Sequence, residues 1–414
     1  MTETANIRFI GVCSYFDTNT NNNLKMNMMI KMIKYVVALS AFCFLTFGSA
    51  MAQLVENSQP AVTNISKTSC PCILENLSVV FKVKAPDAKK VQIDLGKLYD
   101  MTKDDQGVWS VTTAPQVPGF HYYSLVIDGV KVADPASESF YGTGKMSSAI
   151  DIPEKGADFY QIKDVPQGAL SSKYYFSKVT NGWRRLFVYT PPGYDVNTKE
   201  KYPVMYIQHG GGEDERGWAE QGKTDIILNN LIAEKKAKPM IIVIANGNVS
   251  TGRSTGGYSS AGMAAFKDEM TKNIVPFIDK NYRTLADAKD RALCGLSMGG
   301  GQAFYVGLES LDYFGSVGVF SSGIFGGIAN PTGKEFDADK EVPGLLSKSQ
   351  SFNEKLKLFY VSVGEQDPRF EFTKKAVKKF QDSGLKVQFN SFPGDHEWQV
   401  WRKSVHDFAS RLFK

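Results

Sequence analysis

The stretch Arg291-Ala-Leu-Cys-Gly-Leu-Ser-Met-Gly-Gly-Gly301 decides the fold of the C-terminal part of this chain. Its first five residues predict a short buried strand, and the residues from Gly299 to Glu309 predict a helix. Ser297 lies between the two elements, with a glycine two positions before it and another two positions after it. Such glycines permit the sharp turn that lifts a serine hydroxyl above a sheet. Ser297 is therefore the candidate nucleophile, the alternative being a glycine-rich turn with an idle serine.

Strand-like and helical runs alternate on both sides of this turn. Continuous or nearly continuous apolar runs predict strands at 186–190, 204–209, 240–245, 316–321, 358–363 and 387–392. Helical periodicity predicts helices at 224–235, 266–280, 373–383 and 398–413. This alternation predicts an α/β domain over residues 166–414, with a doubly wound, mostly parallel sheet.

The preceding region has a different pattern. Short strand-like runs at 77–83, 91–95, 108–112, 121–127 and 130–133 follow one another without a helical period. Asp128-Gly129 between the last two is a two-residue hairpin signal. We therefore expect a small all-β sandwich over residues 76–165, after a polar leader at 53–75.

Residues 1–52 predict an export signal. Lys25, Lys31 and Lys34 precede an apolar run at 35–47, and Ala50-Met51-Ala52 has the small residues of a cleavage site. Residues before Met26 resemble an over-long start. The apolar run is too short to span a bilayer, so we expect cleavage after Ala52, no membrane span in the mature chain, and a periplasmic or secreted protein. A retained membrane helix is the alternative.

The composition is that of a globular protein, with 43% hydrophobic and 22% charged residues. A formal net charge of +5 over 414 residues gives no electrostatic argument for nucleic acid binding. After cleavage Cys70, Cys72 and Cys294 would remain, which is too few for a disulfide framework. Neither a second cysteine pair nor clustered histidines complete a metal motif, so no metal is expected.

A serine needs a base, and the chain has four histidines. His396 lies in the loop between the last predicted strand and the last helix, where this fold places its base. His121 belongs to the predicted sandwich, His209 precedes a glycine run, and His406 lies within the final helix. His396 is therefore the candidate base.

The acid of a triad should follow a strand between the serine and the histidine. Asp367 satisfies this condition, and Glu365 is its local rival. Asp395 is the sequence neighbour of His396, which makes it badly placed to orient that ring. The order Ser297, Asp367, His396 is the order found in α/β-hydrolases.

Acyl transfer also needs hydrogen-bond donors for the oxyanion of the tetrahedral intermediate. His209-Gly210-Gly211-Gly212 follows a predicted strand, so Gly211 or Gly212 is expected to provide one backbone N–H and Met298 the other. A phosphate-binding loop is the rival interpretation, but no Gly-Lys-Ser/Thr completes it. His209 is expected to orient the loop.

Some features predict less specific roles. Trp218, Tyr258, Phe325 and Trp398 are candidates for lining an acyl pocket, although aromatic residues near loops are often simply packed. The segment 323–348 is long and contains glycines, so it is a candidate insertion over the site.

The chain resembles the feruloyl-esterase group of the family-one carbohydrate esterases. The matching residues are Tyr206 to Asp214, Trp218, Leu231 to Glu234, Lys238 to Ile241, Tyr282 to Thr284, Gly295 to Gly300 and Asp395 to Trp398. The resemblance covers about 171–414, and its pattern places Ser297, Asp367 and His396 as the triad. Residues 81–91 resemble the immunoglobulin-like, early-set module that often precedes these esterases. The chain departs from the family pattern at Asn229-Asn230 and at Cys294, which leaves the triad unaffected.

The resemblance implies a serine esterase that hydrolyses feruloyl esters of plant cell-wall polysaccharide, with no cofactor. An acetyl-xylan esterase or an enterobactin-type siderophore esterase would use the same machinery, and a basic pocket would favour the siderophore substrate. A glycan-binding protein with a vestigial hydrolase domain is the non-enzymatic alternative.

Overall fold

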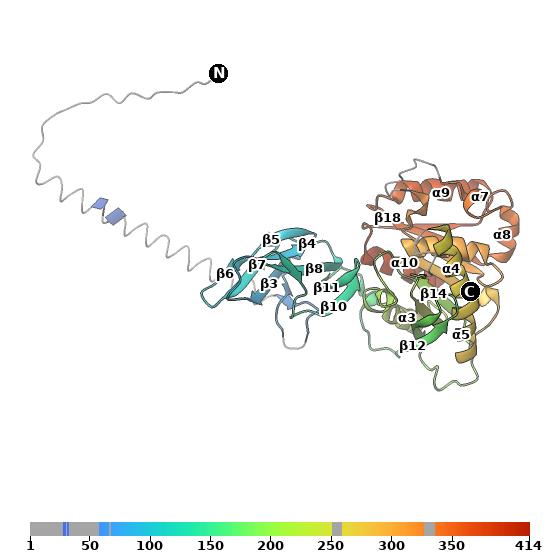
Figure 1. The fold of residues 1–414 in the computed structure, drawn as a ribbon, viewed down its shortest axis with the longest axis horizontal. Helices are drawn as coiled ribbons and strands as arrows, with labels where there is room; N and C mark the ends of the chain where they lie inside the picture. Colours follow the sequence, from blue (N-terminus) through green and yellow to red (C-terminus); the bar gives the residue numbers. More distant parts are fainter. Residues whose placement is uncertain (1–27, 30, 33–57, 66–67, 251–258, 327–335) are drawn as a thin grey trace, which may run out of the picture. The chain divides into compact units, whose positions relative to one another are not determined.

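The computed structural model describes residues 28–29, 31–32, 58–65, 68–250, 259–326 and 336–414 (Figure 1). The chain separates into two compact units, residues 1–59 and 60–414. The apolar run at 35–47, the predicted cleavage site after Ala52 and Tyr258 lie outside the described residues. So does the segment 327–335 of the predicted insertion.

Within the described residues, no helix has the length and hydropathy that crossing a membrane requires.

Two antiparallel sheets form the first part of the larger unit, which we call the β module (residues 60–152). One sheet contains, in spatial order, β2 (Cys72–Ile73), β3 (Val79–Lys84), β7 (Val108–Thr112) and β6 (Thr102–Lys103). The other contains β10 (Ser139–Gly142), β11 (Lys145–Ile152), β8 (Gly119–Ile127), β4 (Val91–Leu95) and β5 (Lys97–Asp100), with β9 (Val130–Val132) paired to β8. The short β1 (Gln59–Pro60) lies at the boundary of the two units.

Alternate residues of these strands fill one core between the two sheets. Val79 and Phe81 of one sheet pack with Ile93, Tyr123 and Ile150 of the other. The hairpin predicted at Asp128-Gly129 is confirmed, because Ile127 pairs with Val130 and both turn residues have positive φ (48° and 90°). The predicted all-β region is thus a two-sheet sandwich.

The second part of the larger unit, the α/β domain (residues 169–414), is built on one eight-stranded sheet. Its spatial order is β12 (Ala169–Ser177), β13 (Gly182–Thr190), β15 (Ile241–Ala245), β14 (Val204–Gln208), β16 (Arg291–Leu296), β17 (Ser316–Phe320), β18 (Leu358–Gly364) and β19 (Gln388–Phe392). The six strands from β15 through β14 to β19 in this spatial order pair in parallel with their neighbours. The strands β12 and β13 add an antiparallel edge to the sheet. This arrangement confirms the predicted mostly parallel sheet.

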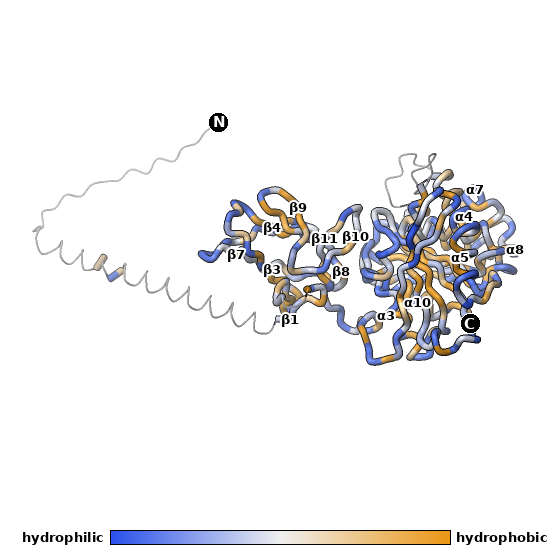
Figure 2. The backbone as a smooth tube through the Cα atoms, turned by 60° about the horizontal axis from the view of Figure 1, so that its bottom comes forward, coloured by the Kyte–Doolittle hydropathy of each residue, from blue (hydrophilic) through white to orange (hydrophobic). Residues whose placement is uncertain are grey.

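Side chains of the central strands are buried on both faces of the sheet, as expected for parallel strands covered by helices. In β14, Met205 and Ile207 face a core shared with α3 (Thr224–Ala233) and α10 (Trp398–Arg411). Val204 and Tyr206 face the opposite core, shared with α4 (Ser260–Glu269) and α5 (Val275–Asn281). Figure 2 shows the hydrophobic strands gathered in the middle of the domain.

The remaining helices complete the two layers. These are α2 (Gly217–Glu220), α6 (Met298–Gln302), α7 (Ala338–Glu341), α8 (Ser349–Lys355) and α9 (Phe370–Asp382). Short 3₁₀ turns are η1 (Asp158–Tyr160), η3 (Ala288–Asp290) and η5 (Gly323–Phe325), and π-helical turns are η2 (Met270–Ile274) and η4 (Ala303–Gly307).

Two segments differ from the sequence-based expectation. The strand β2 and the buried Ala61 lie before residue 76, so the sandwich begins inside the segment expected to be a loose leader. The strand β12 lies before residue 186, where the first strand of the α/β domain was expected. Most of its side chains are exposed, so it lacks the continuous apolar run that reveals a buried strand.

The β module and the α/β domain share a core and a buried ion pair. Phe120, Phe140 and Ala149 of the module belong to the same cluster as α3 and α10. Asp151 at the end of β11 lies 3.0 Å from Nη1 of Arg402, and neither side chain is more than 5% exposed. Burial alone would raise the pKa of Asp151, but Arg402 and Lys223 outweigh it and hold this pKa below its usual range.

The Asp151–Arg402 pair should stabilise the protein strongly, because removing one partner leaves an uncompensated buried charge. We expect Asp151→Asn to lower the free energy of unfolding by about 3–5 kcal/mol in urea titrations at pH 7. The matched control is Asp382→Asn, which breaks an exposed bridge to Lys378 and should cost less than about 0.5 kcal/mol. Similar losses for both variants would contradict a special contribution of the buried pair.

Candidate active site

Ser297 occupies a tight turn between β16 and α6. Its φ of 51° is unusual for a residue with a side chain, and its N–H donates to the carbonyl oxygen of Phe320 at 2.8 Å. A Cβ at Gly299 would lie 2.5 Å from the carbonyl oxygen of Gln208, and one at Gly295 would lie 2.6 Å from the backbone of Gly299. Only glycine therefore allows the turn to approach the end of β14 this closely.

Three of the predicted site residues come together. The Nε2 atom of His396 lies 3.0 Å from Oγ of Ser297, and its Nδ1 atom lies 2.7 Å from Oδ2 of Asp367. These distances allow a proton to pass from the serine to the ring while the carboxylate holds the ring in place. The three residues follow β16, β18 and β19, so they meet at the carboxyl edge of the sheet.

The Asp367 carboxylate is buried and fully engaged. Its Oδ1 atom accepts hydrogen bonds from the backbone N–H and from Nη1 of Arg369, both at 2.9 Å. Burial alone would raise the pKa of Asp367, but the hydrogen bonds from His396 and Arg369 outweigh it and keep this pKa below its usual range. Asp367 is thus held as an anion facing the Nδ1 atom of His396.

The alternative residues make other contacts. Glu365 accepts a hydrogen bond from Ser391 at 3.1 Å in an exposed position. Asp395 accepts from the backbone N–H of His396 at 2.7 Å. His406 packs against Phe159, with ring centroids 4.7 Å apart, and its burial lowers its pKa.

The glycine loop (residues 209–215) follows β14 and borders Ser297. Gly210 donates its N–H to Oε2 of Glu213 at 3.0 Å, so this donor is already engaged. Gly212 has a φ of 76°, and its carbonyl oxygen accepts from the N–H of Gly144 in the β module at 2.7 Å. Of the two glycines predicted as oxyanion donors, Gly211 lines the cavity at Ser297, whereas Gly212 contacts the module.

His209 is fully buried, and both of its ring nitrogens are engaged. The N–H of Gly247 donates to Nε2 at 3.0 Å, so the proton of the neutral ring is on Nδ1, which donates to the carbonyl oxygen of Gly210 at 2.8 Å. Burial lowers the pKa of His209, which keeps the ring neutral. These contacts agree with the expected role of His209 in orienting the loop.

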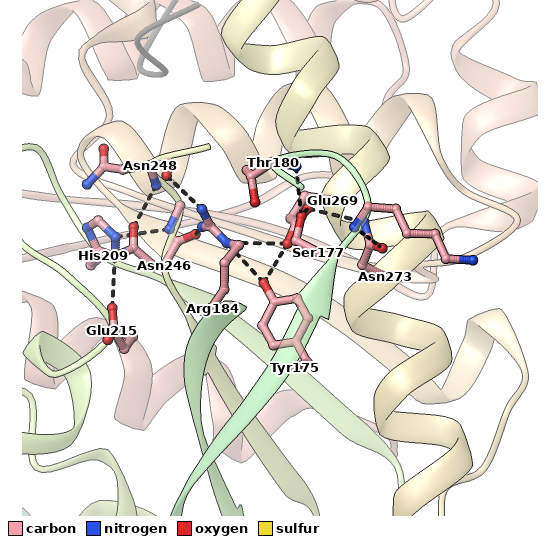
Figure 3. A network of polar contacts seen from close by, with 12 residues as sticks. Tyr175, Ser177, Thr180, Arg184, His209, Glu215, Asn246, Asn248, Glu269 and Asn273 are labelled. Atoms are coloured by element: carbon pink, nitrogen blue, oxygen red, sulfur yellow. Dashed lines mark hydrogen bonds and ion pairs between the residues drawn. The ribbon is translucent and has the colours of Figure 1, made fainter. Parts of the chain in front are cut away.

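A network of polar contacts connects Glu215 of the glycine loop to the buried Glu269 (Figure 3). Arg184 lies 3.3 Å from the buried Glu269 and donates to the carbonyl oxygen of Asn246 at 2.6 Å. Asn246 in turn donates to Glu215 of the loop at 2.8 Å. The other donors to Glu269 are Tyr175, Ser177 and Asn273.

A cavity of about 400 Å³ opens onto Ser297 and His396. From the α/β domain it is lined by Gly210, Gly211, Glu213, Leu296, Glu397, Trp398 and Trp401 in addition to these two residues. The β module contributes seven more, among them His121, which the sequence pattern placed in a separate module away from the site. That expectation was wrong, because the close contact between module and domain has no local sequence signal.

The four predicted substrate-binding aromatic residues lie in different places. Trp398 lines the cavity. Trp218 is buried and packs against Trp398, with the centroids of the two rings 5.3 Å apart. Its indole N–H donates to the carbonyl oxygen of Gln208. Phe325 packs in the core beside α9, and Tyr258 lies outside the described residues.

Trp401 and Glu213 are two of the cavity residues that were not predicted. Trp401 lies one turn after Trp398 on α10 and meets the His396 ring edge-on, at a centroid distance of 5.0 Å. The i, i+3 spacing of the two tryptophans was the available signal. Glu213 is buried in the cavity wall, and its burial raises its pKa to about 7.

Comparison with known proteins gives one family and several relatives. Residues 177–411 match the sequence model of the family described as esterase. The chain is 35% identical over 344 residues to an endo-1,4-beta-xylanase/feruloyl esterase of Xylanibacter ruminicola, which covers 81% of this chain and 44% of that protein. It is 33% identical over 199 residues to endo-1,4-beta-xylanase Y of Acetivibrio thermocellus, of which it covers 17%. The chain thus spans less than half the length of these two relatives.

Solved structures share the fold. The CE1 ferulic acid esterase of Anaeromyces mucronatus is 27% identical, with a TM-score of 0.52, over 62% of this chain and 95% of that one. The enterobactin esterase of Shigella flexneri has a TM-score of 0.60 at 17% identity, over 81% of this chain and 92% of that one. The second likeness extends to the fold alone.

Asp367→Asn tests the geometry around the His396 ring. Because Oδ1 accepts two hydrogen bonds from Arg369, the Asn amide oxygen should take that position and its NH₂ group should face Nδ1 of His396. The proton of the ring would then move to Nε2, which could no longer accept the serine proton. We expect kcat for ester hydrolysis to fall by about 10³- to 10⁴-fold. The same measurement on Glu365→Gln should show a change of less than about twofold, and a larger effect there would contradict the assignment.

Glu213 should make stability depend on pH. The folded protein keeps the Glu213 proton up to a pKa of about 7, whereas the unfolded chain releases it near the ordinary glutamate pKa of 4.5. Its stabilising contribution is therefore fully present below pH 4.5 and lost as the pH rises to 7. Between pH 4.5 and 8, the free energy of unfolding measured in urea should fall in the wild type by about 3 kcal/mol more than it falls in Glu213→Gln. Parallel pH profiles for the two proteins would show that this proton is not retained.

Proposed function

The chain belongs to the esterase family, and from this premise we propose that it is a serine carboxylic ester hydrolase that releases hydroxycinnamoyl groups, such as ferulate, from plant cell-wall polysaccharide. The observation that carries the chemistry is the pair of contacts made by His396, at 3.0 Å from Ser297 and 2.7 Å from Asp367. The names of the relatives and the lining of the cavity support the choice of substrate.

The proposed reaction has two stages. Ser297 attacks the ester carbonyl while Nε2 of His396 takes the serine proton, and the resulting imidazolium gives that proton to the departing sugar oxygen. Water then attacks the acyl-enzyme with the same ring as base, which releases the acid and regenerates the serine. Asp367 stabilises the imidazolium and keeps the proton of the neutral ring on Nδ1.

Two backbone N–H groups are proposed to bind the oxyanion. Met298 is the first residue of α6, so its N–H has no partner within the helix and points toward the helix N-terminus. Gly211 is the proposed second donor, because it lines the cavity and the N–H of the preceding Gly210 is engaged by Glu213. Gly212 is the less favoured choice, since its backbone packs against the β module.

The cavity walls support an aromatic acyl group. Phe120, Tyr122, Trp398 and Trp401 line it together with Leu296, and flat apolar surfaces of this kind suit a planar hydroxycinnamoyl group. An acetyl group would fill little of a cavity of about 400 Å³. The relative from Xylanibacter ruminicola carries both xylanase and feruloyl esterase in its name, which is the basis for proposing a cell-wall polysaccharide.

The charge of the cavity argues against an anionic substrate. Among its described lining residues there is no lysine or arginine, while Glu213 and Glu397 bring two carboxyl groups. A basic pocket was the feature expected to favour a catecholate siderophore. A neutral sugar ester therefore suits this cavity better than an anionic iron–catecholate complex.

Export is also proposed, because a polysaccharide of the plant cell wall is met outside the cell. The sequence features of residues 1–52 support a signal peptide with cleavage after Ala52. Edman sequencing of the protein recovered from the periplasm or medium should begin at Gln53, and a start at or before Met26 would contradict this proposal.

A substrate panel tests the function. We expect the purified protein to show a higher kcat/KM for methyl ferulate than for acetylated xylan or a catecholate trilactone, because ferulate fills the aromatic cavity and carries no charge that its carboxyl groups would repel. Ser297→Ala should reduce turnover at least about 10³-fold, since the nucleophile is lost. The matched control is Ser322→Ala, a change of the same residue type outside the proposed triad. Preferred cleavage of the trilactone or the acetate would contradict the substrate, and full activity of Ser297→Ala would contradict the mechanism.

A further inference from the structure

The β module forms an uncharged wall of the active-site cavity. None of its seven described lining residues carries a carboxylate, an ammonium or a guanidinium group. Four of them bring polar side chains, namely Gln116, His121, Tyr122 and Thr143, and the hydroxyl of Tyr122 accepts a hydrogen bond from Gln221 of the α/β domain. This wall therefore differs from the opposite side of the cavity, which holds the proposed catalytic residues and the carboxyl groups of Glu213 and Glu397.

Close backbone contacts hold this wall in place. A Cβ at Gly119, which begins β8, would lie 2.4 Å from the side chain of Gln399 on α10, so the strand that carries His121 packs directly against this helix. Gly144, next to Thr143, donates its N–H to Gly212 of the glycine loop at 2.7 Å. The module wall is thus positioned by the same loop that borders Ser297.

The contacts that His121 and Gln116 make within the β module determine which of their side-chain atoms can accept a hydrogen bond from a substrate. The Nε2 atom of His121 lies 2.6 Å from the carbonyl oxygen of Val117, which can only accept, so Nε2 carries the proton and Nδ1 of the neutral ring keeps a lone pair. The amide nitrogen of Gln116 donates to the carbonyl oxygen of Ala114 at 2.6 Å, which leaves its amide oxygen as the acceptor.

We propose that His121 and Gln116 of the β module form a subsite for the sugar that carries the ester, so that the module determines specificity for the alcohol part of the substrate. This inference rests on the proposed function. Sugar hydroxyl groups are neutral donors that match two neutral acceptors, whereas the acyl group of a hydroxycinnamate is mostly apolar and suits the tryptophan side of the cavity. His121 and Gln116 are binding residues in this proposal and take no part in proton transfer.

The test compares two esters of the same acid. Wild type, His121→Ala and Gln116→Ala are assayed on methyl ferulate, which has no sugar, and on a feruloylated arabinose–xylose oligosaccharide. Each substitution should lower kcat/KM for the oligosaccharide about 3- to 10-fold, mainly through KM, because one hydrogen bond to the sugar is lost. Turnover of methyl ferulate should stay within about twofold, which also shows that the variant is folded and that the triad is intact.

Two further variants sharpen the comparison. Gln92→Ala removes the same side chain from β4 of the module at a site outside the cavity, and it should leave both substrates unchanged. His121→Asn restores a neutral acceptor near the position of Nδ1 and should recover part of the lost affinity for the oligosaccharide. A merely structural role of His121 would give no such rescue.

The outcomes separate the two proposals. If the wild type cleaves both esters and the variants lose activity on both equally, or on neither, the sugar subsite is refuted while the proposed function stands. If the wild type cleaves neither ester, the proposed function itself is refuted and the subsite with it.

Discussion

The structure around the site depends on one close backbone approach. The turn from β16 into α6 lies so near the end of β14 that a side chain at Gly299 would overlap the carbonyl oxygens of Gln208 and His209. This approach places Ser297 beside the glycine loop, where a Cβ at Gly210 would lie 3.6 Å from Cβ of Ser297. The serine and the loop therefore occupy one small volume, as a nucleophile and its oxyanion donors must.

The sequence predicted the parts of the site that local patterns encode. Ser297 is marked by its glycines, and Asp367 and His396 are marked by their position in loops after predicted strands. Because parallel strands end at one edge of the sheet, these positions imply that the side chains converge. The outline of the α/β sheet was predictable for the same reason, since its buried strands are continuous apolar runs.

The sequence did not reveal features that depend on contacts between distant segments. The edge strand β12 is mostly exposed and has no apolar run, so only its pairing with β13 identifies it. His121 lines the cavity because β8 packs against α10 through Gly119 and Gln399, two residues that lie far apart in the sequence. Trp218 and Phe325 were predicted to line the acyl pocket because they are aromatic and lie near loops, but both pack in the hydrophobic core. Aromatic side chains serve both purposes, and burial does not distinguish them, because the cavity-lining Trp398 is as buried as Phe325.

The arrangement separates two tasks that one cavity must perform. The α/β domain holds the proposed nucleophile, base, acid and oxyanion donors, which act on any ester carbonyl. The β module contributes neutral polar and aromatic side chains, which can distinguish one alcohol or acyl group from another. The contact from Gly144 to Gly212 connects the two parts at the glycine loop. A shift of the module would therefore also act on the loop beside Ser297, so this hydrogen bond connects the wall proposed to select the substrate with the donors proposed to stabilise its transition state.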